Sequence, residues 1–213
     1  MTQSAAHLLL LLVVLTDFAV LGTSRLSACI RWIAFQGALL GVLSLLEGGE
    51  LGWNAILIAA GTIIVKAVAL PAFLRWAIRE ASIRREVEPL IGYLPSMLLG
   101  GAALAAAFAV AASMPASVRD ALVVPVALVT LIIGMIVLIT RVKAITQVIG
   151  YLMLENGVYL FGIRLARHVP FLIEAGVLLD VFVGVFIMGI VVFHINREFD
   201  SISSANLSEL RES

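Results

Sequence analysis

The chain has 213 residues and no net formal charge; 62% of its residues are hydrophobic and only 13% are charged. Soluble domains carry about 25% charged residues. This composition and a mean hydropathy of +1.12 exclude an ordinary soluble domain and indicate a helical membrane protein. The neutral balance gives no reason to expect a nucleic-acid partner, and a single cysteine, Cys29, excludes an internal disulfide.

Apolar runs of about 20 residues are long enough to cross a bilayer as helices and too long for barrel strands. The predicted fold is all-α, a polytopic membrane protein with about seven transmembrane helices, at 5–23, 27–46, 53–76, 91–113, 120–140, 144–165 and 169–195. The first run has no basic region before it and is interrupted by Asp17, so we interpret it as a span and not as a cleaved signal peptide.

Basic residues predict the orientation, because Lys and Arg collect on the cytoplasmic side of membrane proteins. Ten of them fall on one side of the predicted bundle and three on the other. This bias predicts an N-terminus outside and a C-terminus in the cytoplasm. The ten are Arg25, Arg31, Arg75, Arg79, Arg84, Arg85, Arg141, Lys143, Arg197 and Arg211, and the three are Arg119, Arg164 and Arg167.

Small residues in two spans predict close helix packing. The 91–113 span contains a stretch rich in glycine and alanine, from Gly100 to Ala107, without an ionisable residue, and the 27–46 span contains Gly37 and Gly41. Small residues four positions apart let helices approach each other closely in lipid. We expect both segments to serve helix contact.

Three ionisable residues lie near the middle of predicted spans, namely Lys66, Glu155 and Asp180. A charge at the centre of a membrane helix costs about 2.5–3.5 kcal/mol on translocon scales, so we interpret each of these three residues as a candidate functional residue. Pro71 removes the hydrogen bond to the carbonyl of Ala67 and predicts a bend near Lys66. The sequence leaves open whether Lys66 pairs with Glu155 or with Asp180, and whether such a pair is only structural.

Two tyrosines share a helix face with Glu155, because Tyr151, Glu155 and Tyr159 are spaced at i, i+4 and i+8. A carboxylate between two phenols is suited to a hydrogen-bonded proton path. The alternative is a protonated Glu155 that makes a static hydrogen bond between helices.

Asp17 and His194 lie toward the predicted cytoplasmic ends of the first and last spans. Either could be an entry point for protons, although residues at such positions more often contact lipid headgroups. The sequence contains no nucleophile–base pair, phosphate-binding loop or cluster of metal ligands. We therefore expect no catalytic, cofactor-binding or metal site in this chain.

Short motifs lie between residue 124 and the end of the chain: Gly134 to Arg141, Gln147-Val148-Ile149-Gly150 leading to Glu155-Asn156, and Asp180-Val181-Phe182-Val183-Gly184. On these motifs the chain resembles the three-helix K subunit of bacterial respiratory complex I and the C subunit of multisubunit cation/proton antiporters. The resemblance implies one membrane carboxylate, implicated in proton movement, in each of the last two helices. Asp180 takes one of these places, and the other falls on Leu152, one helical turn before Glu155.

The four N-terminal spans, with Lys66-Ala67-Val68-Ala69-Leu70-Pro71 and the basic loop from Arg84 to Leu90, look similar to component E of hydrogenase-4 and formate hydrogenlyase-type complexes. This resemblance implies a non-catalytic subunit in the bacterial cytoplasmic (inner) membrane. The implied partners are antiporter-like and quinone-module-like membrane subunits and a peripheral hydrogenase or redox arm. The nickel–iron centre and iron–sulfur clusters would lie in those partners, with no cofactor in this chain.

We therefore expect a four-helix membrane region at 1–119, a K-subunit-like region at 120–195 and a cytoplasmic polar tail at 196–213. The expected function is proton (or sodium) translocation coupled to redox chemistry in partner subunits. The alternatives are a subunit of a cation/proton antiporter and a non-conducting structural adaptor. Hydrogen bonds within membranes average about 0.6 kcal/mol, too little to offset three central charges, which weighs against the adaptor.

Overall fold

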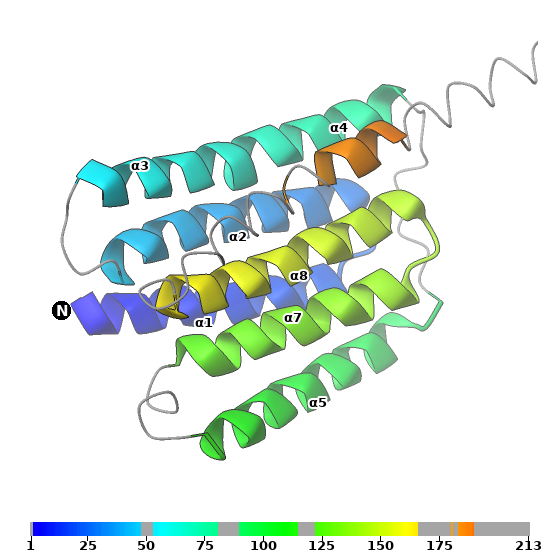
Figure 1. The fold of residues 1–213 in the computed structure, drawn as a ribbon. Coiled ribbons are helices and arrows are strands. Elements are labelled where there is room, and N and C mark those ends of the chain that lie inside the picture. The colour runs from blue at the N-terminus through cyan, green and yellow to red at the C-terminus, as the bar shows by residue number, and fades with distance from the viewer. Residues whose placement is uncertain are drawn as a thin grey trace, which may run out of the picture.

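The computed structural model describes residues 2–47, 53–80, 90–114, 122–165, 180 and 183–189. The predicted all-α class is confirmed, and the helices run side by side in one bundle (Figure 1). Their bounds are α1 Thr2–Leu21, α2 Leu26–Glu47, α3 Trp53–Thr62, η1 Ile63–Ala69, α4 Leu70–Glu80, α5 Tyr93–Ala112, α7 Val123–Thr140 and α8 Ala144–Leu165.

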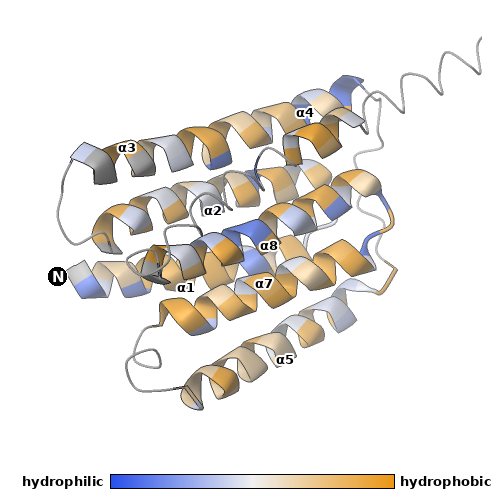
Figure 2. Ribbon diagram, viewed as in Figure 1, coloured by the Kyte–Doolittle hydropathy of each residue, from blue (hydrophilic) through white to orange (hydrophobic). Residues whose placement is uncertain are grey.

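Most of these helices have the length and hydropathy of membrane spans. Among the described residues, five segments qualify, namely Gln3–Leu21, Leu26–Leu46, Ala59–Glu80, Tyr93–Ala112 and Val123–Thr140. Helix α8 has 22 residues and coincides with the predicted 144–165 span, but a hydrophilic stretch interrupts it midway (Figure 2). The predicted span at 169–195 lies mostly outside the described residues, so the number of spans, the orientation and the division into regions stay predictions.

The predicted third span, 53–76, consists of three helical segments and continues to Glu80. Its middle segment, η1, is a π-helix, and the N–H of Leu70 donates to the carbonyl of Val65, five residues earlier. Pro71 follows directly and has no N–H to donate, so the widened turn lies where the sequence predicts a bend. π-Helical turns are rare and occur frequently at functional sites.

Helices α7 and α8 form the tightest pair of the bundle, because glycines face the backbone of the opposite helix. A Cβ atom added to Gly134 would lie 2.5 Å from the nitrogen of Leu154, and one added to Gly150 would lie 2.5 Å from the nitrogen of Leu138. Helices α1 and α2 pack on this pair, and η1 with its flanking helices packs on α2 (Figure 1).

Helix α5 packs at the opposite edge of the bundle, against α7 and α1 (Figure 1). Its buried side is made of small residues, namely Ser96, Gly100, Ala103, Ala107 and Ala111. A Cβ atom on Gly100 would lie 2.7 Å from a methyl group of Leu21, so the glycine permits the contact. The predicted packing role of this span agrees with the structure.

One residue used to predict the orientation is not on the surface. Arg141, between α7 and α8, is only 2% exposed. Its Nη2 donates to the carbonyl of Leu21 at 3.1 Å, and its guanidinium lies 5.5 Å from the ring centroid of Tyr93. Leu21 ends α1, where free carbonyls and the helix dipole attract a cation. Arg141, directly after the end of α7, therefore contacts the end of α1 and the start of α5. Its burial lowers its pKa.

Candidate functional site

The three ionisable residues predicted at mid-span meet in one buried cluster. The Nζ of Lys66, on η1, donates to Oε1 of Glu155, on α8, and to Oδ1 of Asp180 at 3.3 Å. The exposed fractions of the side chains are 5% for Lys66, 0% for Glu155 and 15% for Asp180. The sequence left the partner of Lys66 open, and the structure places Lys66 between both carboxylates.

The position of Lys66 depends on a close contact between η1 and α2. A Cβ atom on Gly37 would lie 2.8 Å from the carbonyl carbon and Cβ of Lys66, and one on Gly41 would lie 2.3 Å from a side-chain carbon of Ile63. Real Cβ atoms essentially never approach this closely. The two glycines of α2 therefore make the helix contact that the sequence predicts, and that contact brings Lys66 toward α8.

The two tyrosines near Glu155 have different surroundings. The Tyr159 hydroxyl shares a hydrogen bond of 2.7 Å with Thr62, and its ring centroid lies 5.5 Å from Nζ of Lys66, a cation–π distance. The hydrogen bonds of the described part of the chain connect neither Tyr151 nor Tyr159 to Glu155. The Tyr151–Glu155–Tyr159 stripe is therefore not a continuous hydrogen-bonded row in this structure.

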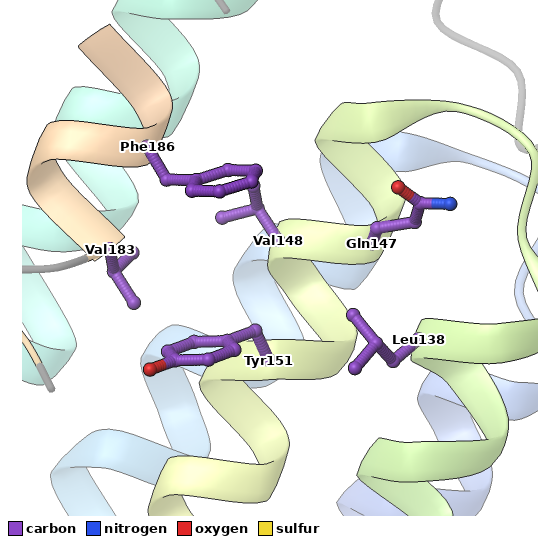
Figure 3. Close-up of a pocket in the computed structure, with 6 residues that line it drawn as sticks. All are labelled: Leu138, Gln147, Val148, Tyr151, Val183 and Phe186. Carbon is purple, nitrogen blue, oxygen red and sulfur yellow. The ribbon is translucent and has the colours of Figure 1, made fainter. Parts of the chain in front are cut away.

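Tyr151 instead lines a pocket of about 280 Å³ one helical turn from Glu155 (Figure 3). Its ring lies between α7 and the segment 183–189, and its hydroxyl points away from Leu138. The lining residues are Leu138, Gln147, Val148, Tyr151, Val183 and Phe186. The walls are mostly apolar, and the Gln147 amide donates to the carbonyl of Arg141 at 3.1 Å.

A second polar cluster lies on another face of α8 and contains Asp17. Nε2 of Gln36 donates to Oδ1 of Asp17 at 2.7 Å, and the Thr130 hydroxyl donates to Oδ2 at 2.8 Å. Nδ2 of Asn156 in turn donates to Oε1 of Gln36 at 2.9 Å. All four side chains are buried, and Asp17 is 0% exposed. Asp17 therefore does not contact lipid headgroups, whereas His194 lies outside the described residues.

Sequence reasoning missed most of this second cluster. Gln36, Thr130 and Asn156 are uncharged, so the cost that marks a buried charge in a membrane span does not single them out. Their presence in apolar runs was a weak signal that they need polar partners, because buried polar groups are hydrogen-bonded. Which partners they take depends on the arrangement of the helices.

The charged cluster contains one ammonium and two carboxylates. Within the described part of the chain, Oε2 of Glu155 is buried and has no hydrogen-bond partner. With all three groups ionised the cluster would carry a net charge of −1, which one proton or one monovalent cation would neutralise. The described residues include no group of three His, Cys, Asp or Glu side chains that could hold a metal ion.

Comparisons with known proteins give relatives along most of the chain. Uncharacterized protein Rv0085 of Mycobacterium tuberculosis is 31% identical over 205 residues, which cover 93% of this chain and 92% of that protein. Hydrogenase-4 component E of Escherichia coli (strain K12) is 26% identical over 157 residues, 72% of each chain, and the protein of the same name from Shigella flexneri matches to the same extent. No family model matches the chain, and no solved structure matches it.

Proposed function

We propose that this chain, which belongs to the family of the Mycobacterium tuberculosis protein Rv0085, is a membrane subunit of a complex-I-like assembly and carries part of a proton (or sodium) path. The similarity to Hydrogenase-4 component E supports membership in a hydrogenase-type complex. The membrane-length helices support a multi-pass membrane location, and we place it in the bacterial inner membrane on the similarity to Hydrogenase-4 component E. Redox cofactors, including a nickel–iron centre and iron–sulfur clusters, would belong to partner subunits in a peripheral arm.

The observation that carries the proposal is the buried cluster of Lys66, Glu155 and Asp180. A buried ion pair is weak evidence for stability, because removing its charges from water costs several kcal/mol. Membrane segments keep such groups mainly where ions or protons move. In a cluster of two carboxylates and one ammonium, Lys66 can move nearer to either carboxylate. A single ion pair does not allow this movement.

Lys66 would couple the protonation of the two carboxylates. At an effective dielectric constant of about 20, unit charges about 4 Å apart attract each other by about 4 kcal/mol. A proton bound by one carboxylate removes that attraction, so the ammonium moves toward the other. A change of about 4 kcal/mol corresponds to roughly a thousandfold change in an equilibrium constant. Movement of Lys66 can therefore favour proton release from one carboxylate and uptake by the other.

Purification of the tagged chain from its native membranes tests the assembly. We expect antiporter-like and quinone-module-like membrane subunits to co-purify with a peripheral redox arm that contains nickel and iron. Recovery with cation/proton antiporter subunits alone, without redox metals, would contradict the redox assignment and favour an antiporter. If the recovered complex holds redox metals but moves no ion during turnover, the ion path is contradicted and the structural adaptor is favoured.

A further inference from the structure

Asp17, Gln36, Thr130 and Asn156, called the amide cluster below, hydrogen-bond across four helices, α1, α2, α7 and α8. Oδ1 of Asp17 accepts a hydrogen bond from Gln36, and Oδ2 accepts one from Thr130. Both polar atoms of the Gln36 amide form hydrogen bonds, because its nitrogen donates to Asp17 and its oxygen accepts from Asn156. A reversed amide would place oxygen against oxygen, so Asp17 fixes the orientation of Gln36.

The route from Asp17 toward Glu155 passes through two carboxamides. A proton relay needs groups that accept a proton and release it, such as carboxylates, hydroxyls, imidazoles or water. The nitrogen of a carboxamide has no acceptor capacity, so Gln36 and Asn156 hold hydrogen bonds without passing protons along. Asp17 also makes no ion pair with any described residue. The amide cluster is therefore suited to positioning and poorly suited to conduction.

The amide cluster and the charged cluster are joined through neighbouring residues on two helices. On α8, Asn156 directly follows Glu155, and on α2, Gly37 directly follows Gln36. Gln36 binds Asn156, Gly37 receives the backbone of Lys66, and Lys66 binds Glu155. Helices α2, η1 and α8 thus form a closed triangle of contacts. The glycine contacts with α7 hold α8 in place, and the hydrogen bond between Gln36 and Asn156 is compatible with the rotation at which Glu155 faces η1.

From this geometry we infer that Asp17 is a positioning residue for the Lys66–Glu155 pair, that it acts through Gln36 and Asn156, and that it does not carry protons itself. The inference deepens the proposed function, since the pair that it positions is the proposed relay. Its main test does not depend on ion translocation.

The lysine composition supplies the probe. The chain contains two lysines, Lys66 and Lys143, so full-length protein with isotope-labelled lysine side chains gives two ammonium signals by NMR. Lys66→Arg assigns the Lys66 signal, and Glu155→Gln shows how far that signal moves when the pair is weakened. Lys143, in the turn before α8, serves as the internal control in every variant.

Two substitutions of Asp17 separate positioning from charge. Asp17→Asn keeps an oxygen that accepts from Gln36 and adds an amide that donates to Thr130, so the Lys66 signal should stay at its wild-type position. Asp17→Leu removes both hydrogen bonds, so the signal should shift by an amount comparable with the shift in Glu155→Gln. If Asp17→Leu fails to fold, Gln36→Met breaks the same chain and should give the same shift.

The opposite results overturn the inference. An unchanged Lys66 signal in Asp17→Leu or Gln36→Met shows that the pair is positioned without Asp17. A shift in Asp17→Asn as large as in Asp17→Leu shows that the charge acts and the hydrogen bonds do not. Loss of ion translocation in Asp17→Asn with an unshifted Lys66 signal makes Asp17 a carrier. Absence of translocation in the wild type contradicts the proposed function and leaves the NMR result valid.

Discussion

Helix α8 separates two polar clusters that are both buried but differ in chemistry. On one face, Glu155 pairs with Lys66, which also contacts the carboxylate of Asp180. On another face, Asn156 joins a carboxyl group that is surrounded by amides and a hydroxyl. Adjacent residues of one helix therefore belong to a cluster in which a lysine contacts two carboxylates and to a cluster in which one carboxyl group binds only neutral side chains. Burial alone does not distinguish the carboxyl groups of Glu155 and Asp17, whereas the chemistry of their partners does.

The charged cluster is broken most strongly by Lys66→Met. This substitution leaves two carboxylates without the cation that the structure places between them, and breaking a buried pair costs about 3–5 kcal/mol. Unfolding of the purified chain in detergent should show this loss. The matched variant Lys143→Met lies outside the cluster and should lose clearly less stability than Lys66→Met. Equal losses in both variants would contradict a special role for Lys66.

The contact that brings the two clusters together is broken by Gly37→Ala. The new methyl group would meet the backbone of Lys66 at 2.8–2.9 Å, so α2 and η1 must separate, at a cost of about 1–3 kcal/mol. Gly101→Ala on α5 adds the same atom where nothing lies within 4 Å. Thermal unfolding should therefore distinguish the variants, and similar stability of both would refute a tight contact at Gly37.

The amide cluster is weakened with little change of shape by Thr130→Val. Asp17 loses one donor, and we expect a stability cost on the order of 1 kcal/mol, within the range of hydrogen bonds in membrane proteins. Thr140→Val is the control, because that hydroxyl binds a carbonyl of its own helix, Ile136, at 2.6 Å. Ion translocation should persist in Thr130→Val, and its loss in a folded protein would argue that the amide cluster conducts.

The smallest expected effect is that of Tyr159→Phe. It removes the hydroxyl that binds Thr62 but keeps the ring beside Lys66, so the cost should be about 0.6 kcal/mol. Tyr159→Leu removes the ring as well and should destabilise the protein further. Denaturant titration of both variants measures the difference, and identical stabilities would exclude a contribution from the cation–π contact.

The helices themselves are readable from the sequence, because length and hydropathy are local properties of each run. The bounds of α8 coincide with the predicted span, and the first five predicted spans differ from the observed helices by a few residues. The exception is the segment around Lys66. Pro71 predicts a bend there, but it does not predict that the turns before it form a π-helix.

The sequence predicts the charged residues of the site but not the contacts between them. Lys66, Glu155 and Asp180 stand out one by one, since a charge at mid-span is expensive. Their meeting joins residues 89 and 114 positions apart, and it depends on which helices are neighbours. Gln36 and Asn156 carry no charge, and they are recognised as a pair only when the contact between α2 and α8 is known. The amide cluster is therefore visible only in the structure.

The most direct test of the account is ion translocation by the intact assembly with Glu155→Gln in this chain. The substitution keeps the size of the side chain and removes its capacity to carry a proton. The matched control is Glu80→Gln, at the exposed end of α4. We predict that Glu155→Gln retains the subunits and redox turnover but loses ion movement, whereas Glu80→Gln behaves as the wild type. Translocation at the wild-type rate in Glu155→Gln would contradict the proposed relay.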